Sequence, residues 1–433
     1  MPKPQIIAGI DIGSSKIATL IASYVDDSEE EKLRVIGVAS VPSRGIRKGQ
    51  IVNIEETTNS LLECVEAAER MAGYNINRAL VAISGPHIAS SNSRGVVAVA
   101  EPEVEINKDD IKRVIEAAQA LSLPASREII HVLPRYFTVD GQDGVKDPIG
   151  MSGVRLEVET HIVTGSSTAI KNLTRSVSEV GIDTQNLVVG GLAAAESVLT
   201  ETEKELGVVL VDIGGGVTDV VIYVEGSPFY TSVLPIGAKN VTNDLAIGLR
   251  LSLESAEKIK LALSTKTEKN EEEEKDEEGK KKNNDEMDLT QLGITEETKT
   301  VSKKTLIEGI IKPRLNEIFS MVGLEIKKSG ATGLTPSGVV LCGGGAQTVG
   351  IVDSAKRTLA MPVRIGQPSR LTGLIDDIQT PDYAVVSGLV LYKANEVSEM
   401  PSFPLGKLGK SLQKIPGKGV ASKFIDLIKS FLP

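Results

Sequence analysis

Residues 207–224 carry the sequence GVVLVDIGGGVTDVVIYV, an apolar run interrupted by an acidic residue and three glycines. The β-branched residues on either side predict two strands, and the glycines predict a tight turn between them. The same order occurs about 200 residues earlier, where residues 9–13 read GIDIG and a second apolar run follows. The two hairpins form a weak internal repeat, and the rest of the chain can be interpreted around them.

Both glycine turns have the chemistry of an anion site. Backbone N–H groups can approach an anion closely where no side chain intervenes. Asp11 and Asp212, just before the turns, could hold a hydrated Mg²⁺, which prefers few protein ligands. Two facing turns would clamp a polyphosphate, whereas either turn alone could be a tight turn without a ligand. The expected phosphate contacts are Gly13, Ser14, Ser15, Lys16, Gly214, Gly215 and Gly216.

A third glycine turn follows the apolar residues 339–342. Its backbone could lie flat against a purine or ribose, or it could be a strand-to-helix loop without a ligand. Helix 252–263 places Glu257 and Lys260 one turn apart on the same face. Taken alone, that pair could equally be a solvated salt bridge. The residues of the third turn are Gly343, Gly344, Gly345 and Ala346.

Other segments are predicted from periodicity and turn residues. Asn53 is the expected N-cap of a helix over 54–72 that stops at Gly73. Residues 86–163 look like a compact insert. Strands are expected over 5–12, 16–25, 33–41, 78–85, 96–100, 127–139, 153–164 and 185–189. Further helices are expected over 107–121, 167–180, 192–205, 239–263 and 301–329.

Composition excludes several classes of protein. The net charge of −10 over 433 residues argues against a nucleic-acid partner, which needs a basic face. We expect no transmembrane helix, because the one uncharged run of 18 residues or more, 329–352, is rich in glycine and polar residues. The N-terminus also lacks the apolar stretch of a signal peptide. Two cysteines and three scattered histidines argue against disulfide scaffolds and metal clusters.

One segment is unusual in charge. Residues 264–286 contain ten acidic and six basic residues and none of the hydrophobic class. Such a segment cannot bury enough apolar surface to offset the entropy of its chain. We therefore expect it to be disordered, as part of a disordered acidic insert of about 264–300, for which a spacer is the simplest role.

The order of these motifs resembles the actin/Hsp70/sugar-kinase ATPase superfamily. The two Asp-Ile-Gly hairpins, the helix start GLAAAESVL over 191–199, the third glycine turn and DYAVVSG over 382–388 carry that resemblance. Within the superfamily, IHVLPRYF over 130–137, VDGQ over 139–142, GMSGVRLE over 150–157 and TETEKELGV over 200–208 resemble the FtsA family of bacterial cell-division proteins. The block over 130–157 is the specific part, because kinases and Hsp70 carry a different subdomain there.

The resemblance implies an actin-like α/β fold of two ribonuclease-H-like domains, with ATP and Mg²⁺ between them. It places Asp11 and Asp212 at the metal, the first two turns at the phosphates, the third at the adenosine, and Glu257 and Lys260 at the adenine or ribose. The implied partition is 1–85 with 164–200 and 380–397 for the first core, 86–163 for a relocated subdomain used in contacts between protomers, 201–238 with 330–379 for the second core, and 239–329 for a further subdomain. Residues 398–419 would be a flexible linker and 420–433 an amphipathic helix.

This sequence departs from the superfamily in one respect. Hsp70 carries a Glu, and actin a Gln, just before the alanine-rich helix, where it positions water. Residues 189–192 read VGGL and offer neither a carboxylate nor an amide. Without a group to orient the nucleophile, we expect hydrolysis to be slow at most.

The C-terminal tip carries an amphipathic pattern. Phe424, Leu427, Ile428 and Phe431 recur at helical spacing, Ile425 and Leu432 widen the stripe, and Lys423 and Lys429 lie on the other face. About 12 residues make roughly 18 Å of helix, too short to span a hydrocarbon layer of about 30 Å. Since residues 401–433 have a net charge of +5, we expect the tip to lie on anionic membrane lipid. The alternative is a helix docked on the body of the protein.

We therefore expect an ATP-binding, actin-like division protein at the cytoplasmic face of the membrane. It would polymerise, tether the tubulin-like protein FtsZ and recruit other division proteins. In the family the FtsZ tail docks on the subdomain that contains 239–329, and Lys303, Lys304 and Glu308 are the candidate contacts unless they are solvated spectators. Two alternatives are a pilus-assembly actin-like scaffold, which would lack the basic amphipathic tip, and a metabolic kinase, which would need an acidic base and an acceptor pocket.

Overall fold

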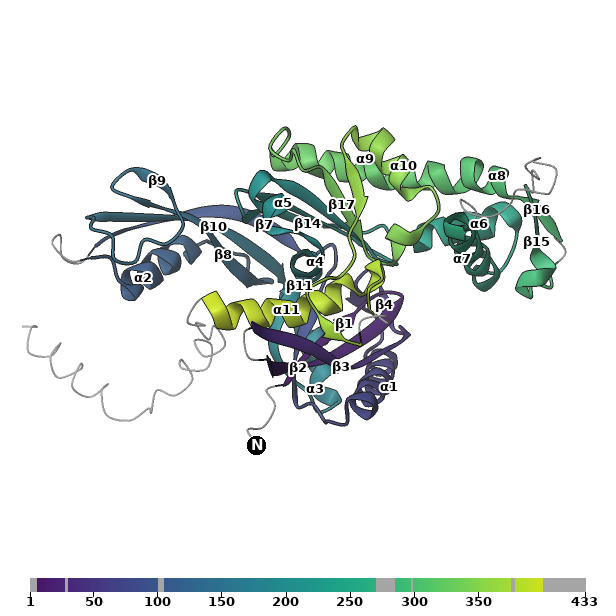
Figure 1. Cartoon of the computed structure of the whole chain (residues 1–433), viewed down its shortest axis with the longest axis horizontal. Helices are drawn as coiled ribbons and strands as arrows, with labels where there is room; N and C mark the ends of the chain where they lie inside the picture. The colour runs from purple at the N-terminus through teal and green to yellow at the C-terminus, as the bar shows by residue number, and fades with distance from the viewer. Residues whose placement is uncertain are drawn as a thin grey trace, which may run out of the picture. The chain divides into compact units, whose positions relative to one another are not determined.

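Two mixed β-sheets are each built around one of the two hairpins. The structure is a computed structural model that describes residues 6–27, 30–99, 105–269, 285–296, 299–374 and 378–399. Residues 1–393 group into one compact unit that contains both sheets, shown in Figure 1. The tip residues 420–433 lie outside the described part of the chain, so the amphipathic helix stays a prediction.

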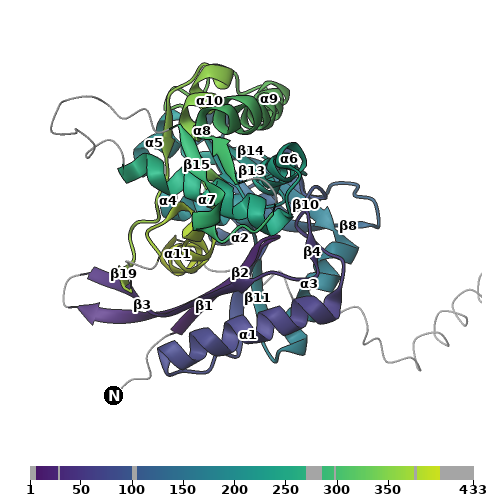
Figure 2. The ribbon, with the colours of Figure 1, turned by 90° about the vertical axis from the view of Figure 1, so that its right-hand side faces the viewer.

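The first sheet has the strand order β11-β6-β1-β2-β3-β19. β1 pairs antiparallel with β2 in the first hairpin and parallel with β6 on its other side. Figure 2 shows α1 beneath this sheet and α11 on the opposite face. Helix α11 comes so close to β1 that a Cβ atom on Gly9 would lie 2.9 Å from Leu389 Cβ. The strands are β1 (Ile6–Ile12), β2 (Lys16–Asp27), β3 (Glu30–Pro42), β6 (Arg78–Ile83), β11 (Asp183–Val189) and β19 (Thr372–Gly373).

The second sheet repeats this pattern and then continues into the insert. Its strand order is β18-β17-β12-β13-β14-β7-β10-β8-β9. β12 pairs antiparallel with β13 and parallel with β17, as β1 does with β2 and β6. The internal repeat seen in the sequence is therefore a repeat of topology. The strands are β7 (Ala89–Ala98), β8 (Arg127–Val139), β9 (Gln142–Val145), β10 (Arg155–Ser166), β12 (Val208–Ile213), β13 (Thr218–Val224), β14 (Ser227–Leu234), β17 (Val339–Cys342) and β18 (Val363–Ile365).

The insert has its own small core under helix α2 (Lys108–Gln119). Ile106, Val114, Phe137 and Leu156 are buried there. Gly95 on β7 lets the helix approach the strand, because a Cβ atom at this position would lie 2.2 Å from the carbonyl oxygen of Val114. The insert joins the second sheet where Ala89 of β7 pairs with Ser232 of β14.

The remaining elements surround the two sheets and connect them. They are α1 (Ile54–Ala72), α3 (Ser167–Glu179), α4 (Gly190–Val198), α5 (Glu201–Leu206), α6 (Lys239–Leu249), α7 (Leu253–Lys269), α8 (Lys303–Leu306), α9 (Lys312–Ser329), α10 (Ile351–Leu359) and α11 (Ala384–Glu399), the π-helix η2 (Ile307–Ile311), the 3₁₀ turns η1 (Leu289–Leu292), η3 (Gly344–Gln347) and η4 (Pro381–Tyr383), and the short pairs β4 (Ile46–Arg47) with β5 (Gln50–Ile51) and β15 (Glu286–Asp288) with β16 (Thr300–Ser302).

The structure confirms the helix predicted over 54–72 and divides two other predicted helices. Helix α1 begins after Asn53, whose side chain accepts from the N–H of Glu56, and ends at Gly73 in the left-handed conformation. Two predicted helices are divided. The helix expected over 192–205 ends before Thr200, which caps α5. The helix expected over 239–263 is interrupted by Arg250, which has a φ of 56°.

The predicted extent of disorder is wrong at both ends. Residues 264–269 continue α7, and residues 285–296 fold as β15 and η1. Met287, Leu289 and Ile294 are buried in the core beneath α7 and α9. These three apolar residues directly follow the charged run. An argument from the average composition of the whole insert overlooks them, because the charged residues dominate the average. Residues 270–284 lie outside the described residues.

Candidate functional site

The first glycine turn, residues 13–16, is closed by its own backbone. The N–H of Gly13 donates to the carbonyl of Lys16 at 3.0 Å. The hydroxyl of Ser14 accepts from the N–H of Gly49 at 2.8 Å. The carbonyl of Ser15 accepts from Ser43. These bonds fix the turn in place before any ligand arrives.

The second glycine turn, residues 214–217, has the same internal bond and an additional anchor. The N–H of Gly214 donates to the carbonyl of Val217 at 2.9 Å. The carbonyls of Gly214 and Gly215 accept from the N–H groups of Ala238 and Lys239, both at 2.9 Å. The start of α6 thus holds these two carbonyl oxygens, which leaves the other side of the turn to its N–H groups.

The two turns meet across the interface of the two sheets. A Cβ atom on Gly215 would lie 1.8 Å from the hydroxyl oxygen of Ser15, and one on Gly216 would lie 2.8 Å from that of Ser14. Only glycine permits this approach. Within the part of the chain that the structure describes, the backbone N–H groups of Ser15, Gly215 and Gly216 have no recorded acceptor. Such N–H groups at a junction without side chains are the donors that an anion needs.

Three carboxyl groups lie behind the turns. Burial raises the pKa of Asp11 to about 6, although the charge of Lys16 opposes the shift. The pKa of Asp212 is raised by burial and then by the charges of Asp219 and Asp11. Asp219, which faces Asp212 in the pairing of β12 with β13, has its pKa raised to about 7, mainly by burial. This environment favours a cation or protons near the three groups.

Asp219 is a site residue that sequence reasoning missed. It stands outside the Asp-Ile-Gly motif. The only signal in the sequence is its position on β13, where successive side chains alternate between the two faces of the sheet. Its carboxylate accepts from Ser84 Oγ at 2.7 and 2.9 Å. It also lies beside Gly191, where a Cβ atom would be 3.1 Å from that of Asp219. Residues 189–192 themselves carry no carboxylate, as the sequence shows, but the fold brings that of Asp219 beside Gly191 from another strand.

Lys16 is directed to another partner in this structure. Its ammonium lies 2.5 Å from Asp382 and 3.7 Å above the centre of the Tyr383 ring. Asp382 also accepts from the side chain of Gln347 at 3.0 Å. Burial would raise the pKa of Asp382, but the charge and hydrogen bond of Lys16 outweigh it and lower the pKa. Lys16 would have to release this carboxylate to reach a phosphate.

Glu257 and Lys260 form a partly buried pair on α7. Their charged atoms are 2.8 Å apart, and the Lys260 side chain is only 9% exposed. The hydroxyl of Thr242 on α6 donates to Glu257 at 2.5 Å and accepts from Lys260 at 3.1 Å. Lys260 is therefore not part of a freely solvated salt bridge.

The third turn packs behind the second. Gly343 has a φ of 81°, and a Cβ atom there would lie 2.1 Å from a carboxylate oxygen of Asp212. A Cβ atom on Gly345 would lie 2.4 Å from Cγ2 of Ile213. The third turn therefore belongs to the same cluster as the first two, and Ala346 is buried within it.

The candidate partner residues form a separate surface. Lys303 and Lys304 are on α8, and the next residues form the π-helix η2. Glu308 is paired with Lys312 at 2.6 Å. The predicted membrane residues, Lys423 to Leu432, lie outside the described part of the chain.

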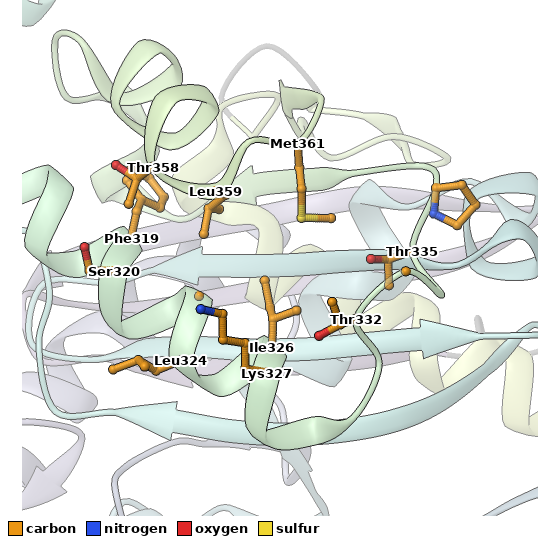
Figure 3. Close-up of a pocket in the computed structure, with 13 residues that line it drawn as sticks. Phe319, Ser320, Leu324, Ile326, Lys327, Thr332, Thr335, Thr358, Leu359 and Met361 are labelled. Atoms are coloured by element: carbon orange, nitrogen blue, oxygen red, sulfur yellow. The ribbon is translucent and has the colours of Figure 1, made fainter.

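A cavity of about 510 Å³ lies away from the glycine turns. Figure 3 shows Phe319, Leu324 and Ile326 of α9, together with Leu359 and Met361, around it. No residue of the three turns lines it. Among the described residues, no helix is long and apolar enough to cross a membrane.

Solved structures share this architecture. A PilM–PilN type IV pilus biogenesis complex matches with a TM-score of 0.60 and 16% identity, over 89% of this chain and 98% of that one. MreB5 of Spiroplasma citri matches with a TM-score of 0.51 and 14% identity, over 92% and 98%. The duplicated hairpins and the relocated insert define an actin-like two-domain protein.

Family models identify the branch. The model described as "Cell division protein FtsA" matches residues 209–388, and "SHS2 domain inserted in FTSA" matches residues 85–164. The chain belongs to the FtsA family of cell-division proteins. Curated FtsA relatives are 39% identical in Pseudomonas aeruginosa (91% of this chain and 91% of the relative), 37% in Bacillus subtilis (90% and 84%) and 33% in Escherichia coli K12 (90% and 90%).

The family assignment decides between the alternatives. The pilus complex shares only 16% identity and therefore supports the fold alone. The FtsA relatives share 33–39% identity over about nine tenths of the chain, which supports a function in cell division.

Proposed function

We propose that the chain binds ATP with Mg²⁺ where the first and second glycine turns meet. The observation that carries this proposal is the contact between Ser15 and Gly215, which leaves no space for a side chain. The related fold of MreB5 was solved with AMPPNP, an ATP analogue, and with ADP. A chain with the same overall fold is a suitable host for the same class of ligand.

The residues present fit both groups. The N–H groups of Ser15, Gly215 and Gly216 supply donors for a phosphate chain, together with the hydroxyls of Ser14 and Ser15. Among the described residues, no group of three or more His, Cys, Asp or Glu is arranged to hold a metal. Mg²⁺ commonly keeps several waters and uses one or two carboxylates. Asp11 and Asp212 are the proposed pair. A bound cation would supply the positive charge that stabilises these two buried carboxylates.

Isothermal titration with ATP, ADP and adenosine, with and without Mg²⁺, tests this proposal. Asp11→Ala and Asp212→Ala should each weaken Mg-ATP binding about tenfold or more, the loss of one charge-assisted contact. Binding in EDTA should change much less, because the carboxylates act through the metal. Unchanged Mg-ATP affinity in both variants would remove the two carboxylates from the site.

Turnover is proposed to be slow. Asp219 supplies a carboxylate near Gly191, but the hydroxyl of Ser84 already donates to both of its oxygens. To orient a water molecule, it would have to share or give up this donor. Phosphate release should therefore stay below about 1 s⁻¹ at saturating ATP, under the range typical of enzymes. A faster rate would favour a true ATPase.

We further propose that residues 239–329 bind the C-terminal tail of FtsZ. Ile247 on α6 is 77% exposed, and η2 packs beside it, since a Cβ atom on Gly248 would lie 2.9 Å from Ile310. With Lys303, Lys304 and Glu308 on α8 and η2, this surface suits a peptide of apolar and acidic side chains. Fluorescence anisotropy with the tail peptide tests it. Lys304→Glu and Ile247→Ser should weaken binding, and Lys258→Glu on α7 should not.

The remaining proposals concern assembly and location. They are supported by the family assignment and the sequence pattern. The chain polymerises through its two-domain body with the insert in contacts between protomers, keeps the domain partition expected above, recruits other division proteins, and attaches by residues 420–433 to anionic lipid at the cytoplasmic face of the division site. Cosedimentation of the full chain with phosphatidylglycerol vesicles, with and without Mg-ATP, tests attachment and polymer formation together.

A further inference from the structure

Lys239 is bonded to both of the facing glycine turns. It is the first residue of α6, and its N–H donates to the carbonyl of Gly215 in the second turn. Its side chain crosses to the first turn, where Nζ lies 2.6 Å from the carbonyl oxygen of Ser14. The two residues joined by this side-chain bond are 225 positions apart. One residue therefore ties the two halves of the cluster together.

The backbone of Lys239 is held rigidly, so that only its side chain is free to change partner. Ala238 and Lys239 each donate to the second turn. Gly237, just before them, lies so close that a Cβ atom there would be 2.5 Å from the carbonyl oxygen of Gly214. The start of α6 can thus shift relative to the second turn only if this contact is broken.

The charge of the Lys239 ammonium is only weakly compensated. Its recorded partner is a neutral carbonyl, whereas Lys16 has the carboxylate of Asp382. Burial lowers the pKa of Lys239, and Glu257 opposes that effect while Lys260 adds to it. Glu257 is itself bonded to Lys260 and Thr242. A cation in this position has more to gain from an anion than from a carbonyl, because charge-assisted hydrogen bonds are about twice as strong as neutral ones.

We propose that Lys239 senses the phosphate chain of the nucleotide. Without nucleotide, its ammonium bonds to Ser14 and holds the two turns together. With a nucleoside triphosphate present, the ammonium leaves Ser14 for the phosphate oxygens, so that contact between the turns depends on phosphate charge. This inference rests on the proposed ATP site and assigns to Lys239 the role that the sequence had suggested for Lys16.

The first test measures binding of adenosine, ADP and ATP by calorimetry. Lys239→Gln keeps a hydrogen-bond donor and removes the charge. It should weaken ATP binding about tenfold, ADP less, and adenosine by less than about twofold. Lys239→Arg should recover most of the ATP affinity. Lys258→Gln is the matched control. Lys258 is a half-exposed lysine on α7, the helix that follows α6, and it pairs with Glu254 of the same helix. Unchanged ATP affinity, or an equal loss for all three ligands, would overturn the proposal.

The second test uses hydrogen exchange without nucleotide. Loss of the bond to Ser14 should speed exchange in peptides that cover residues 13–16 and 214–217 of Lys239→Gln, relative to wild type and Lys258→Gln. Equal exchange would overturn the linking role. If wild type binds no nucleotide at all, the proposed ATP site fails, while this exchange experiment still decides whether Lys239 joins the turns. Circular dichroism confirms that each variant is folded.

Discussion

The hydroxyl of Ser84, one residue past the end of β6, donates to both oxygens of Asp219 on β13, at 2.9 and 2.7 Å. The two residues belong to different sheets and are 135 positions apart. The bond therefore joins the two halves of the fold beside the glycine turns. It also satisfies a buried carboxyl group whose pKa is raised to about 7.

Stability without nucleotide should fall as the pH rises through the range set by Asp219. Its pKa increases from 3.8 to about 7 on folding, so the folded state retains the proton longer than the unfolded state does. The stabilisation that this raised pKa gives the folded state is complete below about pH 4. It is lost as the pH rises towards 7, at about 1.4 kcal/mol per pH unit within that window. Thermal melts between pH 5 and 7.5 should show a smaller decrease for Asp219→Asn. Asp353→Asn, at an exposed position on α10, should match wild type; an equal slope in all three would contradict the prediction.

Gly215→Ala should separate the two turns. The new methyl group would start 1.8 Å from Ser15 Oγ and 2.9 Å from Ser15 Cβ, so rotation of the serine hydroxyl alone would not relieve the contact. We expect a destabilisation of about 1–3 kcal/mol and a loss of ATP affinity of about tenfold or more. Gly309→Ala is the control, since that glycine on η2 has no neighbour within 4 Å of a new Cβ atom. Wild-type affinity in Gly215→Ala would show that the turns do not meet in solution.

Met287→Asp tests whether the end of the acidic insert is folded. Met287 is 3% exposed on β15 and packs in the core of the second sheet. Loss of its burial alone is worth about 1.5–3 kcal/mol, and a buried carboxylate adds to that cost. The urea midpoint should therefore decrease clearly. Glu286→Gln, at the exposed neighbouring position, should leave it unchanged. A midpoint unaffected by Met287→Asp would restore the expectation of disorder up to residue 300.

His131 should make the protein less stable in acid. Burial lowers its pKa to about 4 from 6.5, and its Nε2 accepts from the N–H of Val189 at 3.0 Å. The neutral imidazole contributes fully above pH 6.5, and its contribution is lost as the pH falls towards 4. Between pH 7 and 5 this loss amounts to about 2 kcal/mol. His131→Gln cannot take up that proton, so its stability should change less between these two values. Comparing the change with pH, rather than the stability itself, separates proton uptake from altered packing.

Phe424→Glu should release the full chain from anionic vesicles. The prediction rests on the sequence pattern of the tip, where each aromatic side chain offers about 1.5–3 kcal/mol of burial. Binding should fall about tenfold or more because a polymer presents many tips and multiplies the effect of each. Ser430→Glu adds the same charge on the other face and should reduce binding less, while ATP affinity stays constant in both. If truncation after Lys418 leaves vesicle binding intact, the docked-helix alternative takes the place of the anchor.

Local features of the fold could be predicted well. The hairpins were visible because β-branched runs and glycines act within a few residues of each other. The same holds for α1, whose start at Asn53 and end at Gly73 depend on side chain and backbone within one turn. Helix boundaries were predicted wrongly where the hydrophobic periodicity was taken over a long segment. Thr200 and Arg250 each interrupt a helix that periodicity alone would continue.

The sequence by itself determined that two glycine turns follow two strands, that each is preceded by an aspartate, and that the order of motifs matches one family. These features need only neighbouring residues. The tertiary structure decided which side chains gather at the turns. It placed Lys239 on Ser14, turned Lys16 to Asp382, and brought Asp219 beside Gly191. Ion pairs and hydrogen bonds form between groups that folding brings within about 3 Å, and positions 225 or 366 residues apart along the chain carry no local signal of that proximity.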